Sequence, residues 1–280
     1  MSEQRVSHYR NGRLTFDVID SGPLDGIPVV LLHGFPQRAS SWSAVSEHLH
    51  DHGLRTIAPD QRGYSPGARP RSRFGYRISG LVSDVVALMS AIGPGPVHLV
   101  GHDWGAAVAW SVAGAHPDRV SSLTAVSVPH PGAFLRSMLS SNQALKSYYM
   151  ALFQLPVVPG LILAARGGRG DELLRRAGMT RSMIETFHDD VVDHGALPGG
   201  LGYYRSMMLS APTQFGRKVS VPTTYIWSDG DVALGRKGAD LTKNFVSGPY
   251  DFTIIEGASH WLPDERPEEI AASIIARIGV

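Results

Sequence analysis

Short apolar runs alternate with amphipathic stretches along the first part of the chain and again near its C-terminus. The apolar runs have the length and the Val, Ile and Leu content of buried β-strands. They lie at residues 14–20, 28–32, 55–59, 97–101, 120–128, 223–228 and 251–257. Helical patterns lie at residues 40–53, 79–93, 105–117 and 267–279. Because strands that alternate with helices form mainly parallel sheets covered on both faces, we predict an α/β fold with such a central sheet.

The alternation stops between residues 130 and 217. This segment is rich in Met, Tyr, Gly and Pro and contains no clear strand pattern, and Pro-bearing segments flank it. We therefore predict a helical cap at 130–217, inserted into a core domain made of residues 1–129 and 218–280. A chain of 280 residues is long enough to bury a sizeable core in one such domain.

Composition excludes several classes of function. The chain has no cysteine, which excludes disulfides, thiolate metal sites and thiol catalysis. Its net charge of +1 predicts no electrostatic attraction to nucleic acid or to an anionic membrane. No apolar stretch approaches the ~20 residues of a membrane helix, and the N-terminus lacks the apolar region of a signal peptide. We expect a cytoplasmic protein without an integral membrane segment, and a homodimer stays open.

The sequence GHDWGA at 101–106 lies where a predicted strand ends and a predicted helix begins. Gly101 and Gly105 flank Asp103 with the spacing of a nucleophile elbow, in which the central residue is usually Ser. Such a turn exposes the central side chain above the carboxyl ends of the strands, where open α/β sheets bind ligands. Asp is also a preferred N-cap residue, so the following helix would explain Asp103 without catalysis.

Two further polar residues follow predicted strands. Asp231 follows strand 223–228 in the loop SDGDV, and His260 follows strand 251–257 in the loop ASHWLP. Both loops open at the same edge of the sheet as Asp103, and the order nucleophile, acid, histidine is that of an elbow-type catalytic triad. Either residue alone could be an ordinary loop residue. The agreement of all three in position and order favours a triad.

The sequence HGFP at 33–36 directly follows the predicted strand 28–32. A turn here can place the backbone N–H of Phe35 beside that of Trp104, and two such donors form an oxyanion hole. A plain Gly-Pro turn would explain the same residues, so the motif is weak by itself.

These segments together resemble the α/β-hydrolase superfamily. The motifs HGFPQ, DQRGYSPG, GHDWGA and GASHW carry the resemblance, which runs from about residue 14 to the C-terminus. With Asp at the elbow, the chain resembles the branch of this superfamily that contains epoxide hydrolases and haloalkane dehalogenases. The resemblance implies an α/β-hydrolase fold with a helical cap and an epoxide hydrolase acting on an apolar small molecule.

Two segments of the predicted cap, SYYMALFQLP and GGLGYYR, resemble epoxide hydrolases in particular. In that family each segment contributes a tyrosine that points into the pocket, and the matching positions are Tyr149 and Tyr204. Two positions depart from the family. Gly202 stands where Asn is usual, and Ser65-Pro66-Gly67 replaces the usual Gly-x-Ser after RGY.

The chemistry of epoxide opening fits these residue types. A carboxylate such as Asp103 is ionised at neutral pH and can attack a saturated carbon without a base, which forms an alkyl ester. His260 would then activate a water to hydrolyse the ester, and Asp231 would orient the imidazole. The two backbone donors would hold the oxyanion, and the cap tyrosines would donate to the leaving alkoxide. No metal or organic cofactor is required.

Haloalkane dehalogenase is the nearest alternative because it uses the same nucleophile. A leaving halide needs N–H donors, and Trp104 can supply one. In that family the second donor is a cap Trp or an Asn directly after the HG dipeptide, but this position is Phe35 and residues 130–217 contain no Trp. Fluoroacetate dehalogenases carry an Arg directly after the nucleophile, where this chain has Trp104. A non-catalytic ligand-binding protein is disfavoured because the triad is complete, and an ester hydrolase is disfavoured because the elbow lacks Ser.

Other polar residues have ordinary explanations. Asp229 competes with Asp231 as the triad acid, but the family's G-x-x-D-like pattern favours Asp231, and Asp229 fits a turn. The sequence HDDVVDH at 188–194 matches no standard metal-ligand spacing and fits the polar face of a cap helix. His102 is interpreted as structural because its side chain points away from that of its neighbour in the elbow.

Overall fold

The structure is a computed structural model that describes residues 4–210 and 216–280. Residues 1–3 of the predicted core and 211–215 of the predicted cap lie outside the described residues. The described residues form one eight-stranded sheet in the order β1-β2-β4-β3-β5-β6-β7-β8, in which β2 runs antiparallel to both of its neighbours, β1 and β4, and all other pairs are parallel. The strands are β1 His8–Asn11, β2 Leu14–Ser21, β3 Ile27–Leu32, β4 Leu54–Pro59, β5 Val97–His102, β6 Val120–Val126, β7 Thr223–Ser228 and β8 Tyr250–Ile255. This sheet confirms the predicted fold class.

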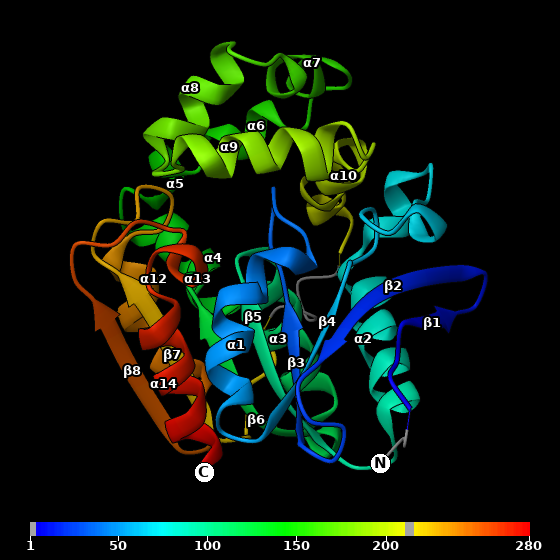
Figure 1. Ribbon diagram of the computed structural model, residues 1–280. Helices are drawn as coiled ribbons and strands as arrows, with labels where there is room; N and C mark the ends of the chain where they lie inside the picture. The colour runs from blue at the N-terminus through cyan, green and yellow to red at the C-terminus, as the bar shows by residue number, and fades with distance from the viewer. Residues whose placement is uncertain (1–3, 211–215) are drawn as a thin grey trace.

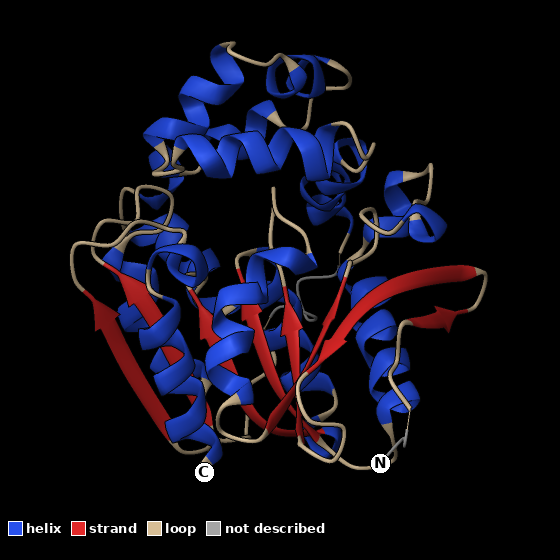
Figure 2. Cartoon of the chain, in the orientation of Figure 1, coloured by secondary structure: helices blue, strands red, loops and turns tan. Residues whose placement is uncertain are grey.

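Helices cover both faces of the sheet because its central strands are apolar on both sides (Figures 1 and 2). The helices around the sheet are α1 Ser43–His50, α2 Ile78–Ile92, α3 Trp104–Ala115, α12 Arg236–Thr242, α13 Leu262–Glu265 and α14 Pro267–Ile278. Val29 and Leu31 of β3 pack toward α1 and α14, whereas Val30 and Leu32 pack toward α2 and α3. The pairing register makes β3, β5 and β6 end at about the same height in the sheet, because Leu32 lies opposite Gly101 and His102 lies opposite Val126. The loops that leave β3, β5 and β6 therefore meet at one edge.

The described residues between β6 and β7 form helices above this edge (Figure 1). These helices are α4 Pro131–Ser140, α5 Gln143–Lys146, α6 Tyr148–Leu152, α7 Val158–Ala164, α8 Arg169–Arg176, α9 Arg181–Phe187 and α10 Leu197–Ser206. A one-turn π-helix, His188–Val192, continues α9. The inserted helices agree with the predicted fold, while the cap limits at 130 and 217 stay predictions.

Strand β1 and helix α12 are two of the core elements that were not predicted from the sequence. Strand β1 pairs with β2, and Tyr9 stacks on Phe16 with 4.6 Å between the ring centroids. Its signal is the Asn11-Gly12 dipeptide, a typical hairpin turn, and Gly12 has a φ of +59°. Helix α12 (Arg236–Thr242) also went unpredicted, because its run RKGADLT shows no clear apolar period.

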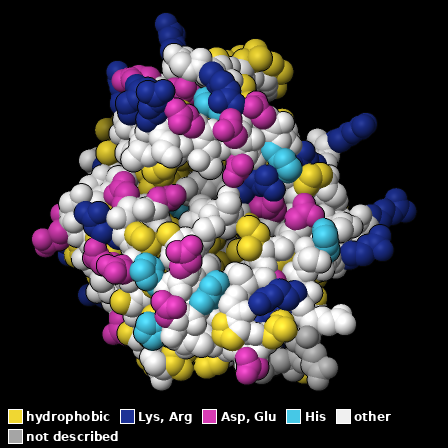
Figure 3. Space-filling model, in the orientation of Figure 1, with side chains coloured by type: hydrophobic (Ala, Val, Ile, Leu, Met, Phe, Trp, Pro, Cys, Tyr) yellow, Lys and Arg dark blue, Asp and Glu magenta, His cyan; other side chains and the backbone are white. Residues whose placement is uncertain are grey.

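The surface agrees with a net charge near zero. On the face drawn in Figure 3, basic and acidic side chains are interspersed over both the sheet domain and the inserted helices. Among the described residues, no helix has the length and apolar character needed to cross a membrane.

Candidate active site

The elbow places Asp103 between the end of β5 and the start of α3. Asp103 has a φ of +50° and a ψ of −122°, which is strained for a residue with a side chain. A Cβ on Gly101 would overlap the backbone of Gly105, and a Cβ on Gly105 would overlap the carbonyl of Leu32. Asp103 occupies the N-cap position of α3 but makes no side-chain capping hydrogen bond. Helix capping therefore does not explain this Asp.

We expect Gly105→Ala to destabilise the fold by more than ~2 kcal/mol, because the new methyl group meets backbone that cannot move without disturbing β3. Gly160→Ala in α7 is the matched control, since its nearest added contact would be 3.8 Å away and Ala favours a helix. Thermal unfolding of both variants measures the difference. Equal melting temperatures would contradict the need for glycine at the elbow.

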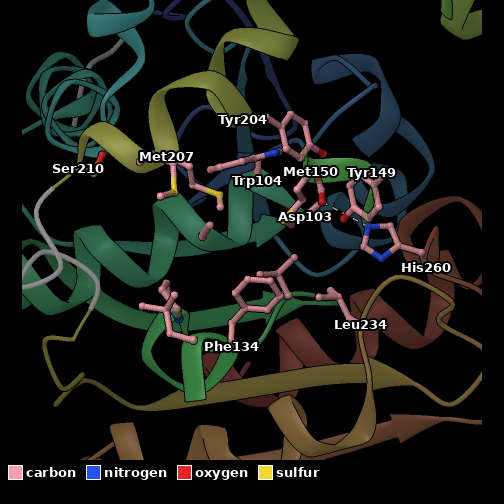
Figure 4. Close-up of a pocket in the computed structure, with 15 residues that line it drawn as sticks. Asp103, Trp104, Phe134, Tyr149, Met150, Tyr204, Met207, Ser210, Leu234 and His260 are labelled. Atoms are coloured by element: carbon pink, nitrogen blue, oxygen red, sulfur yellow. Dashed lines mark ion pairs between the residues drawn. The ribbon is translucent and has the colours of Figure 1, made fainter. Parts of the chain in front are cut away.

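The structure brings Asp103, His260 and Asp231 together. His260 Nε2 lies 3.5 Å from Asp103 Oδ2 (Figure 4). His260 Nδ1 lies 2.7 Å from Asp231 Oδ2. The other Asp231 oxygen accepts hydrogen bonds from the backbone N–H groups of Ala233 and Leu234, at 2.8 and 2.9 Å. These bonds fix the carboxylate, so that its free oxygen faces the imidazole.

The structure separates Asp229 from the site. Its Oδ1 accepts a hydrogen bond of 2.8 Å from the backbone N–H of Gly257, and its side chain is exposed. Of the two candidate acids, Asp231 is therefore the one that contacts His260.

The HGFP turn reaches the nucleophile. The backbone N–H of Phe35 donates to Asp103 Oδ1 at 2.7 Å. A Cβ on Gly34 would overlap the Asp103 side chain, so glycine is what lets the two loops approach this closely. The backbone N–H of Trp104 also interacts with the Asp103 carboxylate, from the first position of α3. The two predicted donors thus converge on the same carboxylate.

The electrostatics of the pair favour an ionised carboxylate beside an imidazolium. Burial alone would raise the pKa of Asp103, but the hydrogen bond and the charge of His260 hold it below its ordinary value. Burial alone would lower the pKa of His260, but the charges of Asp231 and Asp103 raise it to about 10. Asp103 is therefore ionised, and His260 stays protonated while both carboxylates are charged.

The two cap tyrosines lie together beside Asp103 (Figure 4). Their ring centroids are 6.1 Å apart, and the Tyr204 ring meets that of Trp104 edge-on at 5.1 Å. Burial, and then the charge of Asp103, raise the pKa values of both Tyr149 and Tyr204. Both hydroxyls therefore stay protonated at neutral pH and can donate hydrogen bonds.

Two cavities, of about 270 and 370 Å³, meet at this group of residues. Asp103, Tyr149, Tyr204 and His260 line both of them. Most of the remaining walls are apolar and come from short helices whose buried faces the sequence did not predict. In the first cavity these walls include Phe134, Leu135, Met150, Met207, Met208 and Leu234. In the second they include Phe35, Leu152, Phe153, Leu163, Leu174 and Trp261.

The two departures from the family pattern have local causes. A Cβ on Gly202 would lie 2.9 Å from the ring of Tyr76, which occupies the space that a larger residue would need. Ser65 is fully buried; its hydroxyl donates to the carbonyl of Asp60 at 2.8 Å and accepts from the N–H of Asp17 at 2.9 Å. Ser65 therefore holds its loop against β2 and lies outside the catalytic group.

The sequence HDDVVDH at 188–194 has protein partners for several of its polar side chains. His188 lies 2.7 Å from buried Asp171, and Asp189 and Asp193 both pair with Arg166. The described residues contain no group of three or more His, Asp or Glu that could hold a metal ion.

Comparisons with known proteins agree with this geometry. Residues 27–159 match the family model described as alpha/beta hydrolase fold. The chain is 33% identical to Epoxide hydrolase A of Mycobacterium tuberculosis, over 92% of each chain, and 34% identical to AB hydrolase superfamily protein YfhM of Bacillus subtilis, over 91% of each. Among solved structures, it is similar to an epoxide hydrolase A from Mycobacterium thermoresistibile (TM-score 0.80, 27% identity, 95% of each chain) and to VrEH1 from Vigna radiata (TM-score 0.81, 28% identity, 99% of each chain).

The fold and the elbow define an α/β hydrolase. Within that superfamily, the chain belongs to the epoxide hydrolase family.

Proposed function

We propose that this protein is an epoxide hydrolase that opens an apolar organic epoxide to a vicinal diol through an alkyl ester on Asp103. The observation that carries the proposal is the placement of His260 between Asp103 and Asp231, at 3.5 and 2.7 Å, with Tyr149 and Tyr204 beside the nucleophile. The apolar cavity walls favour an apolar substrate.

In the first step, a carboxylate oxygen of Asp103 bonds to one epoxide carbon, and the C–O bond of that carbon breaks. Phe35 already donates to Asp103 Oδ1, which leaves Oδ2, on the His260 side, free to attack. The departing alkoxide takes a proton from a tyrosine hydroxyl. The imidazolium of His260 supplies the proton that restores the tyrosine, so His260 ends the step neutral.

The second step follows from the change in charge. When the ester forms, Asp103 loses the negative charge that helps to hold the pKa of His260 at about 10. The neutral imidazole can then take a proton from a water, whose oxygen attacks the ester carbonyl carbon. The N–H groups of Phe35 and Trp104 hold the resulting oxyanion. Collapse releases the diol, whose new hydroxyl takes the acid proton of Asp103, and leaves the original carboxylate and imidazolium.

We expect Asp231→Ala to slow ester hydrolysis by about two to four orders of magnitude, because His260 loses the partner that orients it and stabilises its charge. Asp229→Ala is the matched control in the same loop, and it should change the rate by less than about threefold, since Asp229 contacts only backbone at the surface. Single-turnover kinetics on an epoxide measure both. The reverse ranking would show that the wrong acid was assigned.

A panel of four substrates tests the proposed function: an aryl epoxide, an alkyl epoxide, a haloalkane and a nitrophenyl ester. We expect diol from at least one epoxide and no halide release, because Phe35 stands where dehalogenases carry a donor Asn and residues 130–217 contain no donor Trp. Halide release with inert epoxides would favour the dehalogenase, and turnover of none of the four would favour a ligand-binding protein. The cap limits, a homodimer and a cytoplasmic location stay predictions.

A further inference from the structure

The backbone carbonyl of His260 accepts two buried side-chain hydrogen bonds. His102 Nε2 lies 2.9 Å from this oxygen, and Ser127 Oγ lies 2.8 Å from it. The preceding carbonyl, of Ser259, accepts a bond of 2.6 Å from Ser228 Oγ. These donors stand at the ends of β5, β6 and β7, so three strand ends hold the loop that carries the catalytic histidine.

Ser127 holds an unusual backbone conformation. It has a φ of +66°, in the left-handed region that glycine adopts without strain, and it is fully buried. Its N–H donates to the carbonyl of Ile226 at 2.8 Å, and its carbonyl accepts from the Tyr225 hydroxyl at 2.9 Å. Strained residues persist where their surroundings fix them, and they cluster at functional sites. What Ser127 offers here and a glycine lacks is the hydroxyl that reaches His260.

The His102 bond has a defined donor. A carbonyl oxygen only accepts, so His102 Nε2 carries the hydrogen. The ring is buried, with its centroid 5.1 Å from that of His260, and burial lowers the pKa of His102 to about 4. His102 is therefore a neutral donor that holds the loop without adding a second positive charge beside the imidazolium.

We infer that His102 and Ser127 are positioning residues, which fix the backbone of His260 so that its Nε2 is aimed at the water that hydrolyses the Asp103 ester. This inference rests on the proposed function. Because His102 is also the neighbour of Asp103, one strand end sets the positions of both the nucleophile and the base. The effect belongs to ester hydrolysis, since opening of the epoxide itself needs the carboxylate and a tyrosine proton, and His260 returns a proton to the tyrosine only after the C–O bond has broken.

Two matched pairs of variants separate positioning from packing. In His102→Gln the side-chain amide can put an N–H near the place of Nε2, whereas the shorter His102→Asn cannot reach it. Ser127→Ala removes the hydroxyl and keeps the strain; Ser127→Gly removes the hydroxyl and relieves the strain. Ser127→Gly should therefore unfold at a higher temperature than Ser127→Ala although both lack the donor.

The readout is the ratio of two single-turnover rate constants on an epoxide, one for alkylation and one for ester hydrolysis. We expect His102→Asn, Ser127→Ala and Ser127→Gly to lower the hydrolysis constant by about ten- to a hundredfold, the cost of a small misplacement of a catalytic group. Alkylation should stay within about threefold, and His102→Gln should keep most of the hydrolysis rate. Alkyl-enzyme should then accumulate in the three defective variants.

Three results would overturn the inference. If both rate constants fall together, or if only the melting temperature changes, the two residues merely stabilise the fold. If Ser127→Gly hydrolyses the ester at the wild-type rate, its hydroxyl positions nothing. His260→Ala distinguishes this failure from failure of the proposed function. If His260→Ala traps the ester while the His102 and Ser127 variants hydrolyse it at the wild-type rate, only the positioning role is rejected. If no variant forms the ester, both the positioning role and the proposed function are rejected.

Discussion

His260→Ala is expected to stop the reaction at an alkyl ester on Asp103. The variant keeps the carboxylate, the Phe35 donor and both tyrosines, so the first attack on the epoxide should still occur. Hydrolysis needs a base at the ester, and His260 carries the imidazole whose Nε2 lies 3.5 Å from the Asp103 carboxylate. We expect the hydrolysis rate to fall by about three to four orders of magnitude, as when a triad histidine is removed.

Mass spectrometry measures this result directly. After incubation with an epoxide, the intact mass of His260→Ala should rise by one substrate, and the peptide that contains Asp103 should carry the addition. His52→Ala is the control, because His52 is exposed and lies outside both cavities, and it should turn over normally without accumulating the ester. If His260→Ala turned over while its mass stayed unchanged, the covalent mechanism would be wrong.

The sequence predicted the sheet well because buried parallel strands are apolar on both faces. The run at β3 is continuous and apolar, and β5 carries Val97, Leu99 and Val100, with turn or helix signals at the ends of both runs. Strand β1 was not predicted because it is a short edge strand in which only Tyr9 is buried, so it shows almost no apolar periodicity. The Asn11-Gly12 turn was its main signal in the sequence. Helix α12 was not predicted because its sequence has only a weak apolar pattern, and its packing against α4 is visible only in the folded structure.

The candidate site was predictable where it sits on strand ends. Parallel strands end at one edge, so Asp103, Asp231 and His260 could be brought together from their order along the chain. Tyr149 and Tyr204 could be placed only by resemblance to a family, because nothing in a short helix shows which face a distant loop will meet. The apolar walls supplied by Met207 and Met208 were missed for the same reason.

The hydrogen bonds that the His260 carbonyl accepts could not be predicted from the sequence. His102 was interpreted as structural because its side chain points away from that of Asp103, but the sequence could not show what it contacts. Its partner is the carbonyl of His260, 158 residues along the chain. Ser127 gave no signal at all, because its left-handed backbone is visible only in the folded structure.

The second large effect is expected when both cap tyrosines lose their hydroxyls. Tyr149→Phe and Tyr204→Phe should each slow epoxide opening by about ten- to a thousandfold, the range for one lost transition-state donor, and the double variant should nearly abolish it. The loss should fall on alkylation, since an alkoxide leaves in that step and the tyrosines take no part in attack on the ester. Phe keeps the ring that packs against Trp104 and Phe153, so the melting temperature should barely move.

The chain offers a matched control beside each tyrosine. Tyr148 is exposed, and the buried hydroxyl of Tyr203 has no hydrogen-bond partner among the described residues, so Tyr148→Phe and Tyr203→Phe should change the alkylation rate by less than about threefold. Stopped-flow measurement of alkylation with an epoxide compares all the variants. A double variant of Tyr149 and Tyr204 that opens epoxides at the wild-type rate would remove the proton donors from the mechanism. If the wild type also consumed haloalkanes and ignored epoxides, the epoxide hydrolase proposal would be wrong, because a halide leaves without needing a proton donor. Only hydrolysis through an Asp nucleophile would then stand.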